Sequence, residues 1–337
     1  MIIESSAPTR VDLAGSTIDI PPLYLFHKNA ATINFAIDLF AHCRIETRSD
    51  EKIILESIDR GLRVESSLAE IDRLANEEKL ELPSKLVHFF RPAVGFHLTT
   101  RSEAPAGAGL AGSSALNIAC IGALNRLVGD RYEESKFITI AANIETQVIK
   151  VIAGFQDYYP AQFGGAMCLH FRSDGIKREP LAINPIDLEK RVVVCYTGEP
   201  RNSGTNNWEI TKKHIDGDQE TFNLFEGIRD TTLLLREALL AKDWSQVAVI
   251  LREAYPERKK LSPNITTPNM NFLIDRALAS GALAAKICGA GGGGCIAFFC
   301  EENQRENVVK ALSAASEATI LNWKFAERGL TVTVNEK

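Results

Sequence analysis

A glycine-rich segment, PAGAGLAGSSA over residues 105–115, carries the clearest chemistry in the sequence. Its glycines allow the backbone to approach a ligand closely, and the apolar run over 116–124 that follows is typical of a helix. A helix that begins here directs unpaired N–H groups and the positive end of its dipole at the loop. The segment therefore predicts a phosphate site and a nucleotide ligand. A flexible linker is the alternative interpretation, although linkers rarely lead directly into a buried amphipathic helix.

Two consecutive hydroxyl side chains, Ser113 and Ser114, lie near the end of this segment. They suit phosphate oxygens or a Mg²⁺ ion carried by the phosphates. The segment lacks the lysine of the GxxxxGK[ST] loop and the usual setting of the GxGxxG fingerprint. By itself, it therefore indicates a ligand but no particular fold.

A second constellation, RVDLAGSTIDIPP, begins at Arg10. Arg10 interrupts an apolar strand-like segment, and because a buried unpaired charge is costly it needs an anionic partner. Asp19 lies between a Gly/Ser/Thr turn and two prolines, a rigid setting that could direct its carboxylate at sugar hydroxyls. A surface salt bridge for Arg10 and a turn cap for Asp19 are the simpler interpretations, and these residues alone favour them.

Two more carboxylates stand in apolar surroundings, Glu145 on an expected helix and Asp157 between aromatic residues. Burial would raise the pKa of a carboxyl that lacks a partner, and pairing with Arg10 would keep it charged. Phosphoryl transfer needs one carboxylate for Mg²⁺ and one for the hydroxyl of the nucleophile. Glu145 and Asp157 are therefore candidates for these two tasks.

The sequence KICGAGGGG, residues 286–294, places five glycines in six positions between two apolar strands. Two residues are enough for a hairpin turn, so a generous turn is the simple interpretation. The excess of glycine predicts the close approach of another backbone or of a ligand. A further segment, 196–206, is interpreted equally well as an anion site that includes Arg201 or as an ordinary helix start.

The bulk properties restrict the class of protein. The chain has 337 residues and a net charge of −5, which argues against nucleic acid as the main partner. Its seven cysteines form no CxxC pair, and no signal peptide or apolar run of membrane-spanning length is present, so a cytoplasmic protein with reduced thiols is expected. We expect a monomer or homodimer with a small-molecule ligand and no membrane partner.

The expected elements alternate irregularly, which is typical of an α+β fold rather than of regular βαβ units. A division into two domains is expected within residues 172–190, where turn-forming residues gather. Strands are expected over residues 1–5, 9–14, 30–37, 39–48, 51–57, 61–65, 95–103, 191–197 and 329–334, with a strand–loop–strand block over 283–300. Helices are expected over 66–90 with a break at Pro83, from the glycine segment to 128, from about 130 to 150, and over 204–216, 219–241, 244–256, 267–280 and 302–315.

Together, in this order and at this spacing, the four constellations resemble the motifs of the GHMP kinase superfamily. PAGAGLAGSSA is similar to its ATP-phosphate motif and KICGAGGGG to its C-terminal glycine motif. RVDLAGSTIDIPP with GFQDYYPAQFGG most resembles the bacterial sugar-1-kinases of the D-glycero-D-manno-heptose-7-phosphate kinase type. The resemblance implies a ribosomal-protein-S5-like N-terminal domain over residues 1–180, which binds ATP, and a ferredoxin-like α/β-plait domain over 181–337.

The resemblance also implies roles for individual residues. Asp157 matches the catalytic aspartate and Arg10 the basic residue that pairs with it. Glu145 and Ser113 match the Mg²⁺ ligands, although Ala111-Gly112 leaves open whether Ser113 or Ser114 faces the metal. The positions that match the phosphate loop are Pro105, Gly107, Ala108, Gly109, Leu110, Gly112, Ser113 and Ser114, and those that match acceptor-binding positions are Asp19, Ser16, Thr17, Gly291 and Gly292.

The implied function is transfer of the γ-phosphoryl group of ATP·Mg²⁺ to a sugar or sugar-phosphate hydroxyl, preferably the anomeric one. Two departures from the sugar-kinase pattern concern the acceptor side: Ser16-Thr17-Ile18 replaces Gly-Gly-Thr, and Tyr158 replaces the second Gln of QDQ. A mevalonate-type kinase is the alternative enzyme. The alternative from another class is a non-catalytic regulator that binds sugar and ATP. Loss of the acidic residues or of the serines would favour a regulator, but Asp157, Glu145 and both serines are present.

Overall fold

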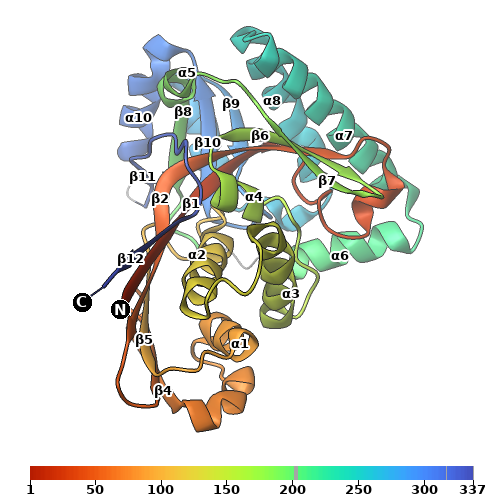
Figure 1. Ribbon diagram of the computed structural model, residues 1–337. Coiled ribbons are helices and arrows are strands. Elements are labelled where there is room, and N and C mark those ends of the chain that lie inside the picture. The colour runs from red at the N-terminus through yellow and green to blue at the C-terminus, as the bar shows by residue number, and fades with distance from the viewer. Residues whose placement is uncertain (201–203, 316, 337) are drawn as a thin grey trace.

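The computed structural model describes residues 1–200, 204–315 and 317–336, and two β-sheets organise it. The long strands β1 (Ile2–Ala14) and β2 (Ala31–Thr47) run from the lower part of the molecule into the upper part (Figure 1). Because they pair along nearly their whole length, one rigid ribbon connects the two halves. Arg10, one of the candidate residues, lies on β1 within this ribbon.

The first sheet has the strand order β12-β1-β2-β5-β3-β4, and β6 and β7 extend it beside β2. Its pairs are antiparallel except for the parallel pair of β3 and β5. Its remaining strands are β3 (Lys52–Ser57), β4 (Leu62–Ser67), β5 (Phe96–Ser102), β6 (Ala166–Arg172), β7 (Gly175–Pro180) and β12 (Thr331–Asn335).

Helix α2 (Gly112–Leu127) is central to the lower half and packs on β1 and β2. Its residues are apolar on nearly all sides because α1 and α3 cover the faces that the sheet leaves open. The other helical segments on this side are α1 (Glu81–Phe90), α3 (Phe137–Ile149), α4 (Tyr158–Phe163), and the 3₁₀ helices η2 (Leu68–Asn76) and η3 (Glu134–Lys136). The 3₁₀ helix η1 (Leu23–Phe26) instead packs beside β6 and contributes Leu23 to a core of the second sheet.

The second sheet is antiparallel, with the order β11-β8-β10-β9, and helices cover both of its faces. Alternate residues of β8 belong to opposite cores, and β10 is buried throughout, which explains its unbroken apolar sequence. The strands are β8 (Val192–Tyr196), β9 (Ala282–Ile287), β10 (Cys295–Cys300) and β11 (Thr319–Ile320). The helices are α5 (Pro185–Arg191), α6 (Gly204–Ile215), α7 (Gln219–Leu240), α8 (Trp244–Lys259), η4 (Pro263–Ile265), α9 (Pro268–Ala279), η5 (Glu302–Gln304) and α10 (Arg305–Ser313).

The α+β class is confirmed, and most expected elements are present. The expected break at residue 38 is wrong, because β2 runs on through it, and the expected break at Ala7-Pro8 is only a shift in the register of β1. Pro83 does not break a helix but lies in the first turn of α1, where its missing N–H costs nothing. The sequence did not predict the hairpin β6–β7, which extends the first sheet beside β2, or helix α4, which packs on β1 and α2.

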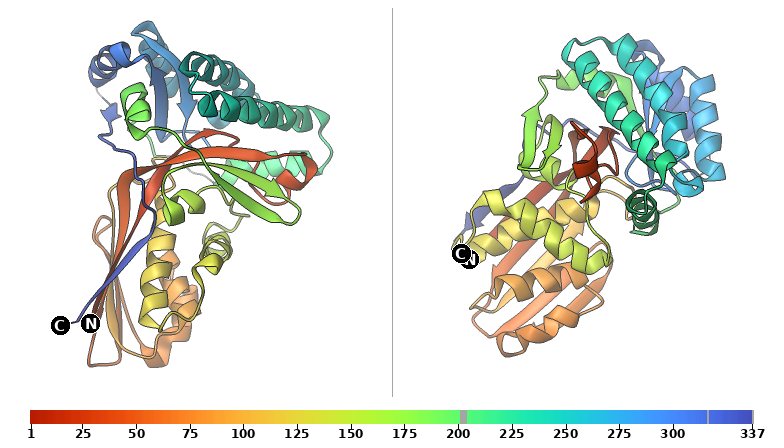
Figure 2. Two further views of the ribbon diagram at one scale, coloured as in Figure 1. Left: turned by 45° about the horizontal axis from the view of Figure 1, so that its top comes forward. Right: turned by 90° about the vertical axis from the view of Figure 1, so that its right-hand side faces the viewer.

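The two ends of the described chain lie side by side (Figure 2), because β12 pairs with β1 at the edge of the first sheet. All seven cysteines are buried, and none of them forms a disulfide. Among the described helices, none combines the length and the apolar character that crossing a lipid bilayer requires.

Candidate active site

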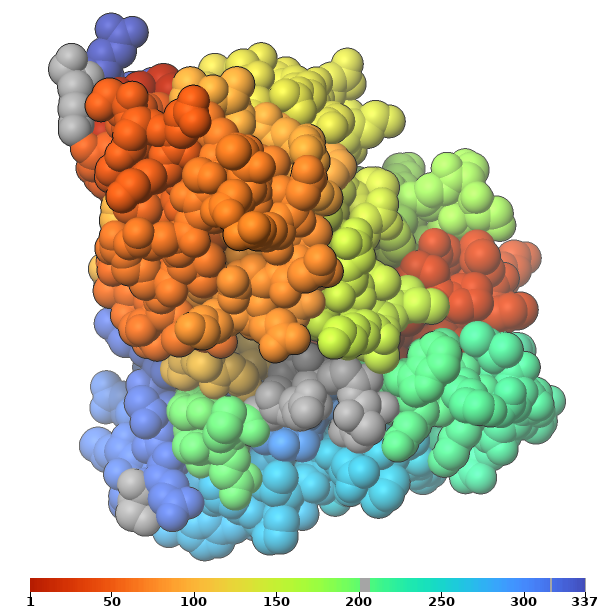
Figure 3. Space-filling view, turned by 90° about the horizontal axis from the view of Figure 1, so that it is seen from below, coloured from red at the N-terminus to blue at the C-terminus, as the bar shows by residue number. Residues whose placement is uncertain are grey.

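A cavity of about 700 Å³ lies where the phosphate-loop candidate, the 154–157 loop and the first strand meet. Its lining comes from both ends of the chain, since Arg10 and Gly289 both face it. In the face shown in Figure 3, the orange segments around residues 50–90 lie opposite the cyan and blue segments of the C-terminal half. Of the sequence candidates, the cavity brings together Arg10, Ser16, Thr17, Asp19, Glu145, Asp157 and the loop from Pro105 to Ser114 except Leu110.

The glycine-rich segment forms the loop between β5 and α2, as predicted. Gly107 and Gly109 have φ values of +70° and +76°, a conformation that glycine adopts without strain. The helix cap, Ala111, is also left-handed, and no side chain caps the first turn of α2. The N–H groups of that turn are therefore available to an anion, which is the arrangement that suits a phosphate.

Arg10 anchors this loop to the carboxylate of Asp157. Its Nε and Nη2 donate to Asp157 Oδ1 at 2.9 and 2.6 Å, and its Nη1 donates to the carbonyl oxygen of Gly109 at 2.7 Å. Burial lowers the pKa of Arg10, but the attraction of Asp157 and Asp12 outweighs it and holds the pKa above its usual value. Arg10 is thus not a surface salt bridge but a buried cation that positions a carboxylate.

Asp157 sits at the start of α4, and a quarter of its side chain remains exposed to the cavity. Both hydrogen bonds from Arg10 end on Oδ1. The second oxygen, Oδ2, is therefore available to a hydroxyl group in the cavity. A carboxylate held on one side and open on the other can orient a hydroxyl and accept its proton.

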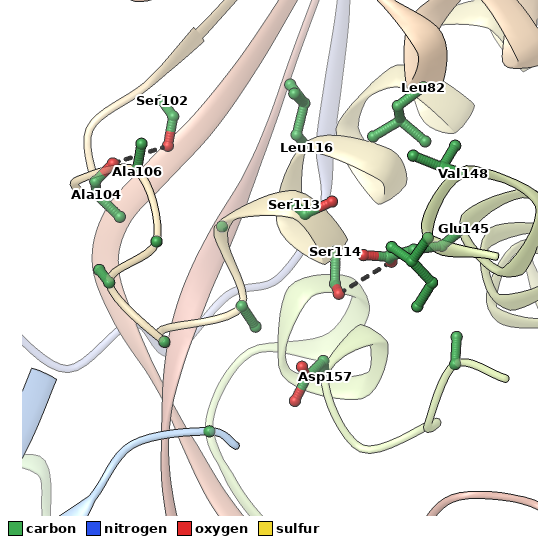
Figure 4. A pocket seen from close by; sticks show the side chains of 18 of the residues that line it. Leu82, Ser102, Ala104, Ala106, Ser113, Ser114, Leu116, Glu145, Val148 and Asp157 are labelled. Atoms are coloured by element: carbon green, nitrogen blue, oxygen red, sulfur yellow. Dashed lines mark hydrogen bonds between the residues drawn. The ribbon is translucent and has the colours of Figure 1, made fainter. Parts of the chain in front are cut away.

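Glu145 lies on α3 and faces the first turn of α2 (Figure 4). Its Oε2 accepts hydrogen bonds from Ser114 Oγ at 3.2 Å and from the Tyr158 hydroxyl at 2.7 Å. Burial raises the pKa of Glu145, and hydrogen bonds from Tyr158, Ser113 and Ser114 oppose that rise. Both serines line the cavity, and Ser113 is the more accessible of the two, since its side chain is exposed whereas Ser114 is buried.

Asp19 is buried, and its Oδ2 accepts a hydrogen bond from the N–H of Gln156 at 2.9 Å. It therefore braces the loop that carries Asp157, a contact that the sequence did not predict. A Cβ at Gly154 would lie 2.2 Å from Asp19 Oδ2, which explains the glycine at that position. Burial, and after it repulsion by Asp157, raises the pKa of Asp19 to about 7.

This raised pKa predicts a stability difference that depends on pH. Between about pH 4 and pH 7 the folded protein keeps a proton on Asp19 that the unfolded chain has lost, so this carboxyl destabilises the fold as pH rises. Asp19→Asn should therefore gain stability relative to the wild type over this range, by at most about 4 kcal/mol. Urea unfolding of both proteins at several pH values from 4 to 8 measures the difference.

The matched control is Asp174→Asn, in the exposed turn between β6 and β7. Its free energy of unfolding should stay close to that of the wild type, because that side chain is exposed to water. A stability difference between Asp19→Asn and the wild type that does not vary with pH would contradict the raised pKa of Asp19.

A buried charge cluster that the sequence analysis missed lies behind the cavity. Asp12 is fully buried, and it accepts from Lys286 Nζ at 2.6 Å, from the N–H of Gly289 at 2.9 Å and from the Ser16 hydroxyl. Arg10 Nη1 lies 3.8 Å from Asp12 Oδ1. This cluster joins β1, the 15–17 turn and the C-terminal glycine loop, and its sequence signal was the presence of charged residues in two apolar strands.

The C-terminal glycine loop touches the phosphate loop directly. The N–H of Cys295 donates to the carbonyl of Ala108 at 2.7 Å, and a Cβ at Gly294 would lie 2.7 Å from the same oxygen. This is the close backbone approach that the glycine count predicts. Gly291 and Gly292, expected near the acceptor, instead pack against Ile265, while Gly289 and Ala290 are the residues of this loop that line the cavity. Arg201, the anion-site candidate, lies outside the described residues.

Comparison with known proteins agrees with this geometry. A D-glycero-alpha-D-manno-heptose 7-phosphate kinase of Campylobacter jejuni is 29% identical over 341 residues, covering 97% of this chain and 98% of the relative. A mevalonate kinase of Thermococcus sibiricus is 26% identical over 355 residues, with 98% of each chain covered. The crystal structure of a D-glycero-D-manno-heptose 1-phosphate kinase from Bacteroides thetaiotaomicron superimposes with a TM-score of 0.79 at 24% identity, covering 99% of this chain and all of that one, and it shares the fold.

Sequence models of one family match both halves of the chain. The model for the GHMP kinases N terminal domain matches residues 79–165, which include the phosphate loop, Glu145 and Asp157. The model for the GHMP kinases C terminal region matches residues 235–318, which include the C-terminal glycine loop. Together the matches span just over half of the 337 residues, and the resemblance seen in the motifs is confirmed: the chain belongs to the GHMP kinase family of phosphotransferases, which use ATP to phosphorylate hydroxyl groups.

Proposed function

We propose that this protein transfers the γ-phosphoryl group of ATP to the anomeric hydroxyl of a sugar or sugar phosphate. One observation carries the proposal: the pair of Arg10 and Asp157 lies in the same cavity as an uncapped helix start on a glycine-rich loop. The loop suits the phosphates of the donor, and Asp157 suits the hydroxyl of the acceptor. Both are needed for phosphoryl transfer, where positioning and charge stabilisation supply most of the catalysis.

In this proposal the backbone from Pro105 to Ser114 holds the phosphates at the start of α2. Asp157 orients the acceptor hydroxyl through Oδ2 and takes its proton. Arg10 supplies the counter-charge of Asp157 and, through Gly109, fixes the loop relative to it. The reacting groups are thus aligned by one buried guanidinium, and alignment of this kind lowers the barrier strongly.

The oxygen donors at Ser113 and Glu145 fit Mg²⁺, which prefers hard oxygen ligands. Ser113 is open to the cavity, and Glu145 faces the same first turn of α2. We assign these two residues as the protein's ligands for the ion. When bound, Mg²⁺ neutralises charge on the phosphates of ATP.

The acceptor side is assigned to Asp19, Ser16 and Thr17, which line the cavity beside Asp157. The similarity to the heptose phosphate kinases described above supports a sugar phosphate as the acceptor. Since Asp19 Oδ2 already accepts from Gln156, its other oxygen is the one available for a sugar hydroxyl.

We further propose that residues 1–180 form the ATP-binding domain and residues 181–337 the second domain. All strands of the first sheet except β12 fall within residues 1–180. The C-terminal strand β12 returns to that sheet, so the last residues of the second domain would stabilise the first.

An assay of ATP consumption against a panel of acceptors tests the function. The panel contains reducing sugars, heptose 7-phosphate and other sugar phosphates, the methyl glycosides of the same sugars, and mevalonate. We expect turnover of a reducing sugar or sugar phosphate and none of its methyl glycoside, because the glycoside blocks the anomeric oxygen.

Each alternative has its own outcome in this assay. Phosphorylation of a methyl glycoside would move the reaction to another hydroxyl. Efficient turnover of mevalonate with no sugar accepted would replace the sugar-kinase proposal with a mevalonate-type kinase. ATP binding without turnover of any acceptor would favour the non-catalytic regulator.

A further inference from the structure

The tyrosine that follows Asp157 does more than fill the core. Tyr158 is the first residue of α4, and only 1% of its surface is exposed. Its ring packs among the apolar residues of the lower core, whereas its hydroxyl reaches out of that core to Glu145 Oε2 at 2.7 Å. A tyrosine hydroxyl has a single hydrogen to donate, and here it is donated to the carboxylate of Glu145.

Two hydroxyl groups therefore meet on one oxygen of Glu145. Tyr158 approaches Oε2 from α4 and Ser114 approaches it from α2, so the carboxylate of α3 is held between two other helices. A glutamate side chain has three rotatable bonds and needs such partners to keep one orientation. Hydrogen bonds to a ligating carboxylate are known to contribute to metal affinity.

Tyr158 also connects the two carboxylates of the site through a single peptide bond. Asp157 is fixed by Arg10, and the next residue fixes Glu145. The first turn of α4 therefore sets the position of the proton-accepting carboxylate and that of Glu145 together. A displacement of one is transmitted to the other.

We propose that Tyr158 is a positioning residue for the metal site, holding Glu145 so that its carboxylate meets the ion bound to the ATP phosphates. The inference rests on the proposed function, which assigns Glu145 as a ligand. It gives a task to the residue that departs from the sugar-kinase motif. Tyr158 lines the cavity, but its hydroxyl donates to Glu145, so in this assignment it acts through that carboxylate.

Binding of Mn²⁺ in place of Mg²⁺ tests the proposal without relying on turnover. The paramagnetic resonance signal of free Mn²⁺ reports its affinity for the full-length protein in the presence of a non-hydrolysable ATP analogue. We expect Tyr158→Phe to weaken Mn²⁺ binding about tenfold and to leave the affinity for the metal-free analogue unchanged. The Mg²⁺ concentration for half-maximal rate should rise by a similar factor, whereas the KM for the acceptor should not change.

Two further variants make the result decisive. Tyr159→Phe removes the hydroxyl of the next residue of α4, whose ring packs on Phe163, and should leave Mn²⁺ affinity unchanged. Glu145→Gln should weaken Mn²⁺ binding at least as much as Tyr158→Phe. The phenylalanine keeps the buried ring, so Tyr158→Phe should remain folded with a nearly unchanged melting temperature.

The possible failures are distinguishable. Wild-type Mn²⁺ affinity in Tyr158→Phe, with weakened binding in Glu145→Gln, would overturn this inference and leave the proposed function standing. Unchanged affinity in Glu145→Gln would remove Glu145 as a ligand and would overturn both this inference and the metal assignment made above, while the acceptor assay would still decide the proposed function. Loss of analogue binding or of the fold in Tyr158→Phe would assign the hydroxyl to the core and also overturn the inference.

Discussion

Asp157→Asn should lower kcat by roughly 10²–10⁴-fold, the usual cost of losing a general base, and should leave ATP affinity close to that of the wild type. The amide has the shape of the carboxylate, and its oxygen can still accept from Arg10 Nε and Nη2 at the position of Oδ1. What the substitution removes is the proton acceptor at Oδ2. Steady-state kinetics with the accepted sugar, together with calorimetry of ATP binding, separates the two effects.

Asp59→Asn is the matched control for this substitution. Asp59 lines the same cavity and accepts a hydrogen bond from Ser57 Oγ at 3.2 Å, but it has no contact with Arg10 among the described residues. Its kcat should remain close to wild type. If Asp157→Asn also turns over near the normal rate, Asp157 is not the base and the mechanism proposed above is wrong.

The local patterns in the sequence predicted the parts of the site that depend on neighbouring residues. The phosphate loop is one stretch of chain between a strand and a helix, so its glycines and the apolar run after it were sufficient to identify it. The charge of Arg10 within an apolar strand likewise required a partner, and Asp157 is that partner. The sequence could suggest this pair because Arg10 and Asp157 both lie in apolar surroundings, where a charged side chain needs a partner.

The contacts that the sequence did not predict join residues far apart in the chain. Asp12 and Lys286 are separated by 274 positions, and no local pattern relates them. Asp19 accepts a hydrogen bond from the N–H of Gln156, and this contact depends on how the 154–157 loop folds back on the turn that carries Asp19. Strand β2 also runs through residue 38, where local alternation suggested a turn, because β1 pairs with it on both sides of that position.

The buried Asp12 should prove the most costly charge to remove. Asp12→Asn is expected to destabilise the protein by about 3–5 kcal/mol, the usual cost of breaking a buried ion pair on one side. Oδ2 faces the ammonium of Lys286, and Oδ1 faces the N–H of Gly289. Whichever way the new amide is turned, its NH₂ group meets a donor, and Lys286 loses its counter-charge. Urea unfolding at pH 7 measures the loss.

The pH dependence of this loss provides an independent check. Burial raises the pKa of Asp12, but attraction to Lys286 and Arg10 outweighs it and holds the pKa well below its usual range. A depressed pKa stabilises the fold above the pKa of the unfolded chain, about 3.9, and that stabilisation is lost as the pH falls. The advantage of the wild type over Asp12→Asn should therefore shrink on acidification below about pH 4.

The control on the same strand is Glu4→Gln, which also replaces a carboxylate of β1 by an amide. Glu4 is exposed and lies 3.7 Å from Arg44, so its loss should cost less than about 0.5 kcal/mol. A cost for Asp12→Asn no larger than that of this surface pair would mean that the cluster of Asp12 and Lys286 does not hold β1 to the C-terminal glycine loop. Since Gly289 lines the cavity and Arg10 borders Asp12, a cost of several kcal/mol instead implies that the active site and the fold depend on the same buried carboxylate.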